Sequence, residues 1–224
     1  DNTPGTATAS GVNQTQYSFL PGIFLQDETE VAKNLVMLAG MRYDYNSTHG
    51  SIFTPRLSLK YSSNAGDVFR LSMGNGYRVV NLFTEDHAAL TGAREVIIAE
   101  ALKPELSWNC NINYSGIIKH SGGFINIDVS GFYTYFTNKI IGDFLTDPGK
   151  IIYDNLQGYA VSKGITINTD GSFTNGIKVN AGLTIMDVYQ INRDSDGKNV
   201  KQPQLFAPAV SGTFAVSYGL AKQK

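Results

Sequence analysis

The feature that most constrains this chain is a run in which apolar and polar side chains alternate one by one. Within Phe124–Thr137, every second residue from Ile125 to Tyr135 is apolar, aromatic or glycine, and most of the residues between them are polar. Successive side chains of a β-strand point to opposite faces, whereas an α-helix repeats every 3.6 residues. The segment is therefore predicted to be a strand with one polar and one apolar face.

The same alternation recurs along most of the 224 residues. Leu106–Tyr114 repeats it, with Cys110 on the apolar face. Gly-, Asp-, Asn- or Ser-rich turns separate the segments, which gives about nine strands and requires no helix. The interval Val79–Ala101 is interpreted as a loop. The remaining predicted strands are Gln16–Gln26, Asn34–Tyr45, Arg56–Tyr61, Phe69–Gly74, Ile151–Thr169, Ile177–Ile185 and Val210–Tyr218.

Composition agrees with an all-β chain and excludes several classes of protein. Charged residues make up 17%, while Gly (23), Tyr (12) and Phe (12) are abundant. The formal net charge of −1 offers no basic surface for phosphates, so nucleic acid is not an expected partner. The single cysteine cannot form an internal disulfide. No apolar run is long enough for a membrane-spanning helix, but spanning strands need only about 9–11 residues.

The predicted connections alternate between short and long. Short turns on one edge and long loops on the other are typical of outer-membrane barrels. Asn46–Ser51 is the exception, because it is short where a long loop is due. The predicted short turns are Asp27–Lys33, Asn64–Asp67, Ile117–Gly122 and Asp170–Gly176, and the predicted long loops are Val79–Ala101, Asn138–Lys150 and Ile191–Gln204.

Tyrosines gather near both ends of the apolar faces. The polar tip and apolar body of this side chain favour the membrane interface. Two such belts indicate an antiparallel, up-and-down transmembrane β-barrel segment more strongly than a soluble sandwich. One predicted belt holds Tyr43, Tyr45, Tyr133, Tyr135 and Tyr189, and the other holds Tyr61, Tyr114 and Tyr218.

Several short motifs, in their order and spacing, resemble successive strands of one family. They are Gly40-Met41-Arg42-Tyr43-Asp44-Tyr45, Thr54-Pro55-Arg56, Gly74-Asn75-Gly76-Tyr77-Arg78, Leu102-Lys103-Pro104-Glu105, and Gly131-Phe132-Tyr133 before Asn138-Lys139-Ile140-Ile141. The series resembles the barrel of TonB-dependent outer-membrane receptors, closest to those of the Bacteroides type, from about Tyr17 to Tyr218.

The resemblance implies a bacterial outer-membrane receptor that takes up a scarce nutrient such as a ferric siderophore, haem or cobalamin. Its implied partners are outer-membrane lipid, its own plug domain, the TonB energy-coupling protein and a small-molecule chelate. Plugged barrels have about 22 strands, so we expect residues 1–224 to be part of one barrel domain. The plug domain and the closing strands are expected to lie outside this chain.

Two sets of charged residues are candidates for the functional site. The first falls on polar faces or near strand ends, where the barrel interpretation turns it toward the lumen, for wall structure, plug packing or, as the minority reading, ligand contact. A charge facing lipid would cost up to about 2–4 kcal/mol at the midplane. This first set is Arg42, Asp44, Arg56, Lys60, Arg70, Arg78 and Glu105, and the second set, in the loop Val79–Ala101, is Glu85, Asp86, His87 and Glu95, which could contact a chelate.

Other chemistry is not expected. The three histidines lie in separate connections, so no protein metal site and no cofactor is predicted. No segment resembles a nucleophile elbow, and no catalysis is predicted. Two alternatives remain open: an unplugged porin, and a soluble β-sandwich that binds or hydrolyses carbohydrate. The sandwich would bury Leu57, Phe69, Ile127 and Val129 in one dry core.

Overall fold

The computed structural model describes residues 6–7, 13–14, 19–79, 94–144, 146–193 and 198–219. Within these ranges the regular structure is all β, and no α-helix is present. None of the described residues forms a helix that is long and apolar enough to cross a membrane. A two-stranded pairing joins β1 (Thr6–Ala7) to β2 (Asn13–Gln14).

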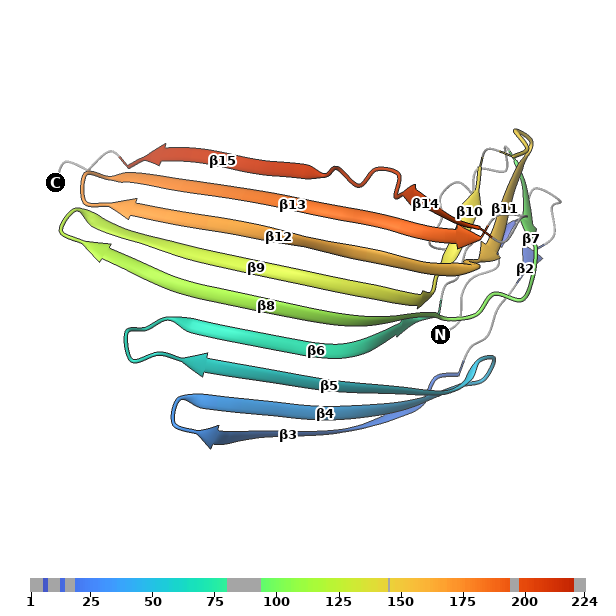
Figure 1. The fold of residues 1–224 in the computed structure, drawn as a ribbon, viewed down its shortest axis with the longest axis horizontal. Helices are drawn as coiled ribbons and strands as arrows, with labels where there is room; N and C mark the ends of the chain where they lie inside the picture. Colours follow the sequence, from blue (N-terminus) through green and yellow to red (C-terminus); the bar gives the residue numbers. More distant parts are fainter. Residues whose placement is uncertain are drawn as a thin grey trace.

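One curved antiparallel sheet of ten strands makes up most of the molecule (Figure 1). Along the path β3 to β14 each strand pairs with its neighbours, and β15 pairs with β13. The strands are β3 (Gly22–Ala32), β4 (Leu35–Asn46), β5 (Gly50–Ser62), β6 (Val68–Arg78), β8 (Glu105–His120), β9 (Gly123–Asn138), β12 (Gly158–Phe173), β13 (Ile177–Arg193), β14 (Asn199–Pro203) and β15 (Val210–Tyr218).

The strands β14 and β15 are two parts of one interrupted strand. Strand β14 pairs with Tyr189–Arg193 of β13, and β15 pairs with Ile177–Ile185 of the same strand. Backbone bonds from Gln204 to Val188 and from Met186 to Ala209 continue the ladder on either side of the interruption. Counted in this way, the large sheet, which we call the wall, has the number of strands that the alternation predicts. This confirms the antiparallel fold class.

Most predicted strands are longer in the structure, and two predicted segments are wrong in a further respect. Strand β3 begins at Gly22 and continues through Asp27–Lys33, which was predicted as a turn. Its acidic residues suggest a turn, but β4 pairs with them up to Ala32, and the turn sits at Lys33-Asn34, where Asn34 has φ 64°. Ile151–Thr169 is two strands, because the chain breaks at Leu156-Gln157 and its first part joins another sheet.

Several predicted connections are shorter than expected because the strands run further. Strands β8 and β9 meet at residues 121–122, and β12 and β13 meet at 174–176. Strand β13 extends to Arg193 and pairs with β14, inside the predicted loop Ile191–Gln204. The predicted loops Val79–Ala101 and Asn138–Lys150 also contain strands, described below.

Short and long connections lie at opposite edges of the sheet, as predicted. The turns at 33–34, 63–67, 121–122 and 174–176 gather at one end of the strands in Figure 1. At the other end lie the connections that follow β6, β9 and β13, and also the short turn 47–49. The intervals Val79–Ala101 and Ile191–Gln204 thus emerge at the same edge, which we call the rim.

A small second sheet, the rim sheet, stands beside this edge. It consists of β7 (Glu95–Ile98), β10 (Ile140–Asp143) and β11 (Lys150–Asn155), in the order β10-β11-β7. Strand β11 runs antiparallel to β10 and parallel to β7. Ile151 and Tyr153 are 2% and 3% exposed and form its core, against Val96, Leu102, Ile140 and Phe144.

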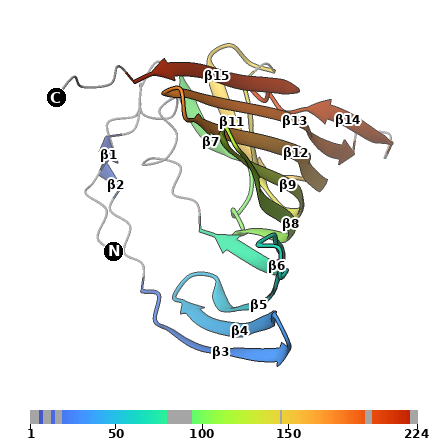
Figure 2. The ribbon, with the colours of Figure 1, turned by 90° about the vertical axis from the view of Figure 1, so that its left-hand side faces the viewer.

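The two faces of the large sheet differ in chemistry. Figure 2 shows that the sheet is curved, with one concave and one convex face. Directly paired residues share a face, and the concave face carries polar ladders such as Ser58 to Ser72 and Thr166 to Thr184, both 3.0 Å between hydroxyl oxygens. The convex face carries rows of apolar residues, with Cys110 between Met73 and Tyr133. The sheet thus separates a polar surface from an apolar one.

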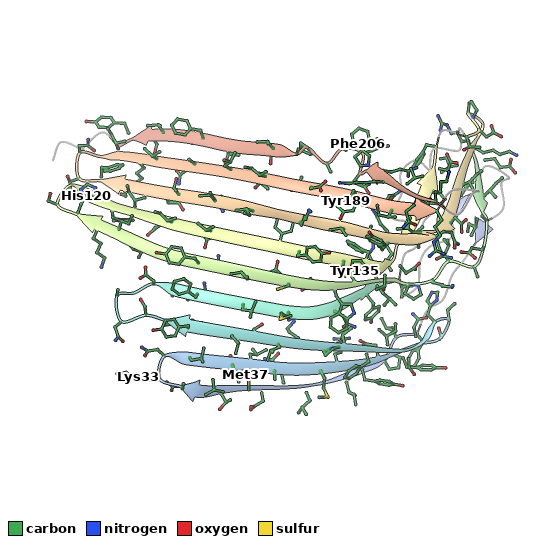
Figure 3. The ribbon with its side chains drawn as sticks, viewed as in Figure 1. Lys33, Met37, His120, Tyr135, Tyr189 and Phe206 are labelled. Atoms are coloured by element: carbon green, nitrogen blue, oxygen red, sulfur yellow. The ribbon has the colours of Figure 1, made fainter. Side chains whose placement is uncertain are left out.

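Aromatic rings cluster near both ends of the convex face. Near the short-turn end, the ring centroids of Tyr61 and Phe69 lie 6.4 Å apart, and those of Phe69 and Tyr114 lie 5.0 Å apart. Tyr135, stacked 5.2 Å from Tyr159, and Tyr189 lie toward the rim (Figure 3). This arrangement is the pair of belts that the tyrosine positions predict.

The described residues have no sandwich core. Leu57 and Phe69 are 40% and 46% exposed, and neither Ile127 nor Val129 is buried. The described buried apolar residues lie near the rim, around the rim sheet and the adjacent strand ends. The soluble β-sandwich alternative is therefore wrong for this chain.

Candidate functional site

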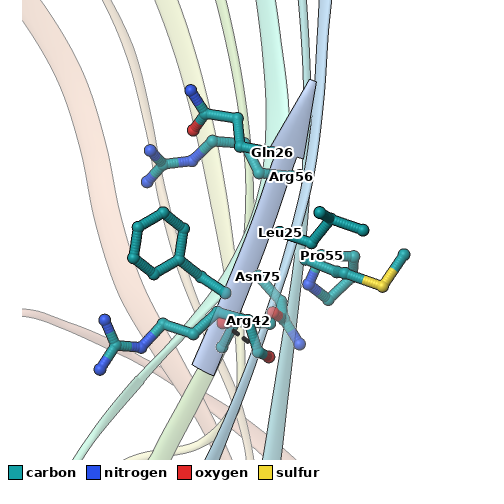
Figure 4. Close-up of a pocket in the computed structure, with 10 residues that line it drawn as sticks. Leu25, Gln26, Arg42, Pro55, Arg56 and Asn75 are labelled. Carbon is teal, nitrogen blue, oxygen red and sulfur yellow. Dashed lines mark hydrogen bonds between the residues drawn. The ribbon is translucent and has the colours of Figure 1, made fainter. Parts of the chain in front are cut away.

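All seven residues of the first predicted set lie on the concave face or at its rim. Register places Arg56 opposite Gly40 and Gly74, and Lys60 opposite Arg70. In Figure 4 the side chains of Arg42 and Arg56 project to one side of the ribbon, with Gln26, while Leu25 and Pro55 project to the other. The alternation of β3 to β6 is what brings these cations from separate strands onto one surface.

The Arg42–Asp44 pair is formed within one strand. The guanidinium donates from Nε to Oδ2 and from Nη2 to Oδ1, both at 2.7 Å, which is a two-point contact. The Asp44 side chain is fully buried, whereas that of Arg42 is half exposed. Gly22 of β3 makes room for this carboxylate, because a Cβ there would lie 1.9 Å from Oδ1. The charge of Arg42 is thus largely committed to Asp44.

Arg56 borders a hollow of about 270 Å³ beside Pro55. The ladder between β5 and β6 ends at Arg56 opposite Gly74, immediately before Pro55, whose nitrogen carries no hydrogen to donate. Beyond that point the Asn75 side chain bridges the strands, donating from Nδ2 to the Phe53 carbonyl at 3.2 Å. The Arg56 side chain has no hydrogen-bond or ion-pair partner among the described residues and faces this hollow.

Lys60 and Arg70 are opposed like charges. They are direct cross-strand partners on the concave face of β5 and β6. Arg70 donates from Nη1 to Oδ1 of Asn113 at 3.0 Å, which is a neutral acceptor, and the Lys60 side chain has no partner in the described part of the chain. Like charges directly opposite one another destabilise a sheet. An anion facing this pair would remove that repulsion.

Glu105 joins three elements at the rim. Its Oε2 accepts from Nε of Arg78 at 3.0 Å and from Nη2 at 2.9 Å, and its Oε1 accepts from the backbone nitrogen of Ile140 at 3.0 Å. The residue is 8% exposed. The end of β6, the start of β8 and the start of β10 therefore share one carboxylate.

Asn155 forms the second junction between wall and rim sheet. Its Oδ1 accepts from the backbone nitrogen of Lys103 at 2.9 Å, and its Nδ2 donates to Oε1 of Glu100 at 2.7 Å and to the Ala101 carbonyl at 3.0 Å. The bond from Asn155 lowers the pKa of the Glu100 carboxyl from its ordinary value. This network fixes the segment that leads into β8.

Lys139 lies between the two junctions, in the link from β9 to β10. Burial lowers the pKa of its ammonium group, and the nearby Arg78 lowers it further, while Glu105 opposes the shift. The ammonium donates to Oε1 of Gln204, which follows β14. A partly buried cation thus connects the rim sheet to the interrupted strand.

The second predicted set is only partly described. Glu85, Asp86 and His87 lie outside the described residues. Glu95 is the first residue of β7, where its backbone nitrogen donates to the Gly149 carbonyl at 2.9 Å and its side chain is exposed. Among the described residues no group of three or more His, Cys, Asp or Glu side chains is placed to hold a metal ion.

Comparison with known families identifies the family to which this chain belongs. A family model described as "TonB dependent receptor-like, beta-barrel" matches residues 1–223. The chain belongs to the TonB-dependent receptor β-barrel family. This membership places the chain in the bacterial outer membrane, with the concave face toward the barrel lumen and the convex face toward lipid.

Curated relatives of this receptor barrel include an iron-regulated outer membrane virulence protein of Vibrio cholerae. The two are 22% identical over 171 residues, which is 75% of this chain and 26% of that protein. The chain therefore spans about a quarter of the length of the curated relatives it matches.

Solved structures share the fold of the receptor barrel. The siderophore receptor PirA of Pseudomonas aeruginosa matches with a TM-score of 0.64 at 15% identity, over 96% of this chain and 45% of that one. The ferripyoverdine receptor of the same organism, bound to ferripyoverdine, matches with a TM-score of 0.59 at 20% identity, over 93% of this chain and 27% of that one.

The junction residues of the receptor barrel were not predicted from sequence. Asn155 and Glu100 contact each other across 55 positions, and Lys139 contacts Gln204 across 65. The one local signal is that Asp154 and Asn155 follow the apolar run Ile151-Ile152-Tyr153, directly before the break at Leu156-Gln157. Glu105 was predicted, but as a lumen-facing group and not as the junction between β6 and β10.

Proposed function

We propose that the whole protein imports a scarce iron chelate as a TonB-dependent receptor, and that this chain supplies part of its wall and outer mouth. The substrate would be a ferric siderophore or haem, with cobalamin a further candidate. The observation that carries the proposal is the set of cations on β5 and β6. Arg56, Lys60 and Arg70 face the lumen without a carboxylate partner among the described residues.

An anionic chelate fits this surface better than a neutral one. Arg42 and Arg78 are neutralised by Asp44 and Glu105, so they contribute little net charge. The three cations on β5 and β6 remain available to a negative group that enters the lumen. Low-dielectric walls around such a surface raise the local concentration of an oppositely charged ligand.

The rest of the transport cycle involves parts outside this chain. A plug domain would close the lumen against these cations, and the TonB energy-coupling protein would power its opening. Residues 1–224 would all belong to one barrel domain. In the external loop, Glu85, Asp86, His87 and Glu95 are proposed ligand contacts, and no catalytic step is proposed.

Uptake by cells that carry the intact gene tests this function. Ferric chelates, haem and cobalamin are compared with and without the inner-membrane coupling protein. We expect one chelate to accumulate only when the coupling protein is present. Equal uptake with and without the coupling protein would favour the unplugged porin and contradict the receptor proposal.

A charge variant tests the lumen cations separately. The double substitution Arg56→Gln/Lys60→Gln is expected to lower uptake of the anionic chelate at least several-fold. Lys178→Gln is the matched control, because Lys178 faces the same lumen from β13, opposite Ser172 and Ser217. Equal uptake by both variants would show that Arg56 and Lys60 do not contribute to uptake, and it would leave the receptor assignment unchanged.

A further inference from the structure

Three charged side chains interrupt the apolar outward face of the wall. Lys163 of β12 lies directly between Tyr133 of β9 and Asp187 of β13, and the next outward pair on β12 and β13 is Ile165 with Ile185. Lys201 of β14 lies on the same face, opposite Ile191. These residues, which we call the outward cluster, have no contact with the lumen cations.

The outward cluster lies at the upper boundary of the apolar band. Lys163 is ten positions from the last residue of β12, Phe173, at the short-turn end. At about 3.3 Å per residue and a strand tilt of about 40°, this separation corresponds to about 25 Å of height. That is the height of the apolar band of an outer-membrane barrel. Tyr135 and Tyr189, in the aromatic belt at the rim end, lie one outward position further up.

The geometry of the outward cluster holds two ammonium groups together. Oδ2 of Asp187 lies 3.3 Å from Nζ of Lys201 and 3.9 Å from Nζ of Lys163. Both ammonium groups lie over the Tyr189 ring, with its centroid 4.0 Å from Nζ of Lys201 and 5.9 Å from Nζ of Lys163. All three charged side chains are about half exposed, at 48–54%.

The charges do not cancel. Asp187 neutralises one of the two lysines, so the outward cluster keeps a net positive charge beside an aromatic ring. An uncompensated cation on a lipid-facing wall is expensive within the hydrocarbon but favourable at the level of anionic headgroups. Lysine pairs with phosphate as a point charge, and its flexible chain can reach upward from the apolar band.

We propose that the outward cluster binds the phosphate group of a lipid headgroup in the outer leaflet of the membrane. Lys163 and Lys201 would contact the phosphate oxygens together, because both ammonium groups already meet at one carboxylate oxygen. Asp187 would pair with the two lysines in the lipid-free protein and would not touch the lipid. Tyr189 would pack against the lysine stems at the boundary between headgroups and acyl chains.

Lipid binding by the full-length protein tests this proposal. The purified receptor in detergent is titrated with a phosphorylated outer-leaflet glycolipid and with the dephosphorylated form of the same lipid, and bound lipid is counted by native mass spectrometry. We expect the phosphorylated lipid to bind at least tenfold more tightly. The substitution Lys163→Gln/Lys201→Gln should remove this preference, and the control Lys178→Gln, on the lumen face, should keep it.

Two further measurements complete the test. The first distinguishes a lipid phosphate from free phosphate, and the second examines the role of Asp187. Inorganic phosphate should displace the lipid only at concentrations far above that of the lipid, and displacement at equal concentration would overturn the lipid assignment. Asp187→Asn leaves both lysines and should bind the lipid at least as tightly as the natural chain. Equal binding of the two lipids, or full binding by the double lysine variant, would also overturn the proposal.

Discussion

Removal of the Glu105 carboxylate should loosen the rim sheet without unfolding the wall. In Glu105→Ala, the backbone nitrogen of Ile140 loses its acceptor and Arg78 loses both of its contacts with this group. The wall keeps its ladders, because Glu105 is the first residue of β8. The effect is therefore expected in β10 and β11.

The magnitude follows from how exposed each partner is. A hydrogen bond to a charged group contributes about 1.5–3 kcal/mol, and this full value applies to Ile140, whose nitrogen would lose its partner in a partly buried link. The Arg78 side chain is 60% exposed and regains water, so its contacts add at most about 1 kcal/mol. A total of about 2–3 kcal/mol corresponds to roughly a 30- to 150-fold rise in local opening.

Hydrogen exchange of the full-length receptor measures this opening. Amides of β10 and β11 should exchange roughly 30- to 150-fold faster in Glu105→Ala, while those of β12 and β13 stay protected. The control is Glu95→Gln, because the Glu95 side chain is exposed and has no partner in the described part of the chain. Unchanged protection of β10 and β11 in Glu105→Ala would refute the role of Glu105 as a junction.

Three further predictions follow from single positions. Gly123→Ala should lower the fraction of folded barrel, because Gly123 has φ +143° and a Cβ would lie 2.2 Å from the Ser172 carbonyl. The control is Gly131→Ala, where a Cβ would have nothing within 4 Å. The folded fraction is measured from the heat-resistant band on gels. The bond from Asn155 lowers the pKa of Glu100, so the ionised carboxylate stabilises this link at neutral pH. Protection of the adjoining amides, normalised to intrinsic exchange, should therefore fall as the pH drops from the ordinary carboxyl pKa through the folded-state pKa. Asn155→Ala should weaken that dependence, because Asn155 is the largest cause of the shift. Lys139→Met should stabilise the link between β9 and β10 against heat, because the partly buried ammonium is costly, and a lower melting temperature would contradict this.

The wall could be predicted from sequence because its physical cause is local. A strand with lipid on one side and a polar lumen on the other must alternate at every position, as Phe124–Thr137 does. The aromatic belts are local for the same reason. Strand β3 was the exception: its lower half carries Asp27, Glu28 and Glu30, and only its pairing with β4 keeps this polar run extended.

The rim could not be predicted in the same way, because its contacts join distant segments. Strand β7 pairs with β11 in parallel, between residues 95–98 and 150–153. No short-range pattern encodes such a pairing, and Ile151 therefore looked like the start of one long strand. The outward placement of Lys163 and Asp187 also depends on the register between β12 and β13.

The distribution of unpaired charge argues for function in one sector of the wall. Around β9 to β15 the lumen carries polar or ion–amide pairs, such as Thr166 with Thr184 and Asp170 with Asn180, and Lys178 there lies opposite two serines and not opposite another cation. On β5 and β6, Lys60 and Arg70 oppose each other with no carboxylate in direct contact among the described residues, and Arg70 reaches Asp128 only through Asn113. If these cations served the wall alone, a carboxylate would be expected beside them, as for Arg42 and Arg78. The repulsion between Lys60 and Arg70 destabilises the sheet locally, and such unrelieved repulsion is typical of a functional surface. We therefore expect these cations to bind a negative group that enters the lumen.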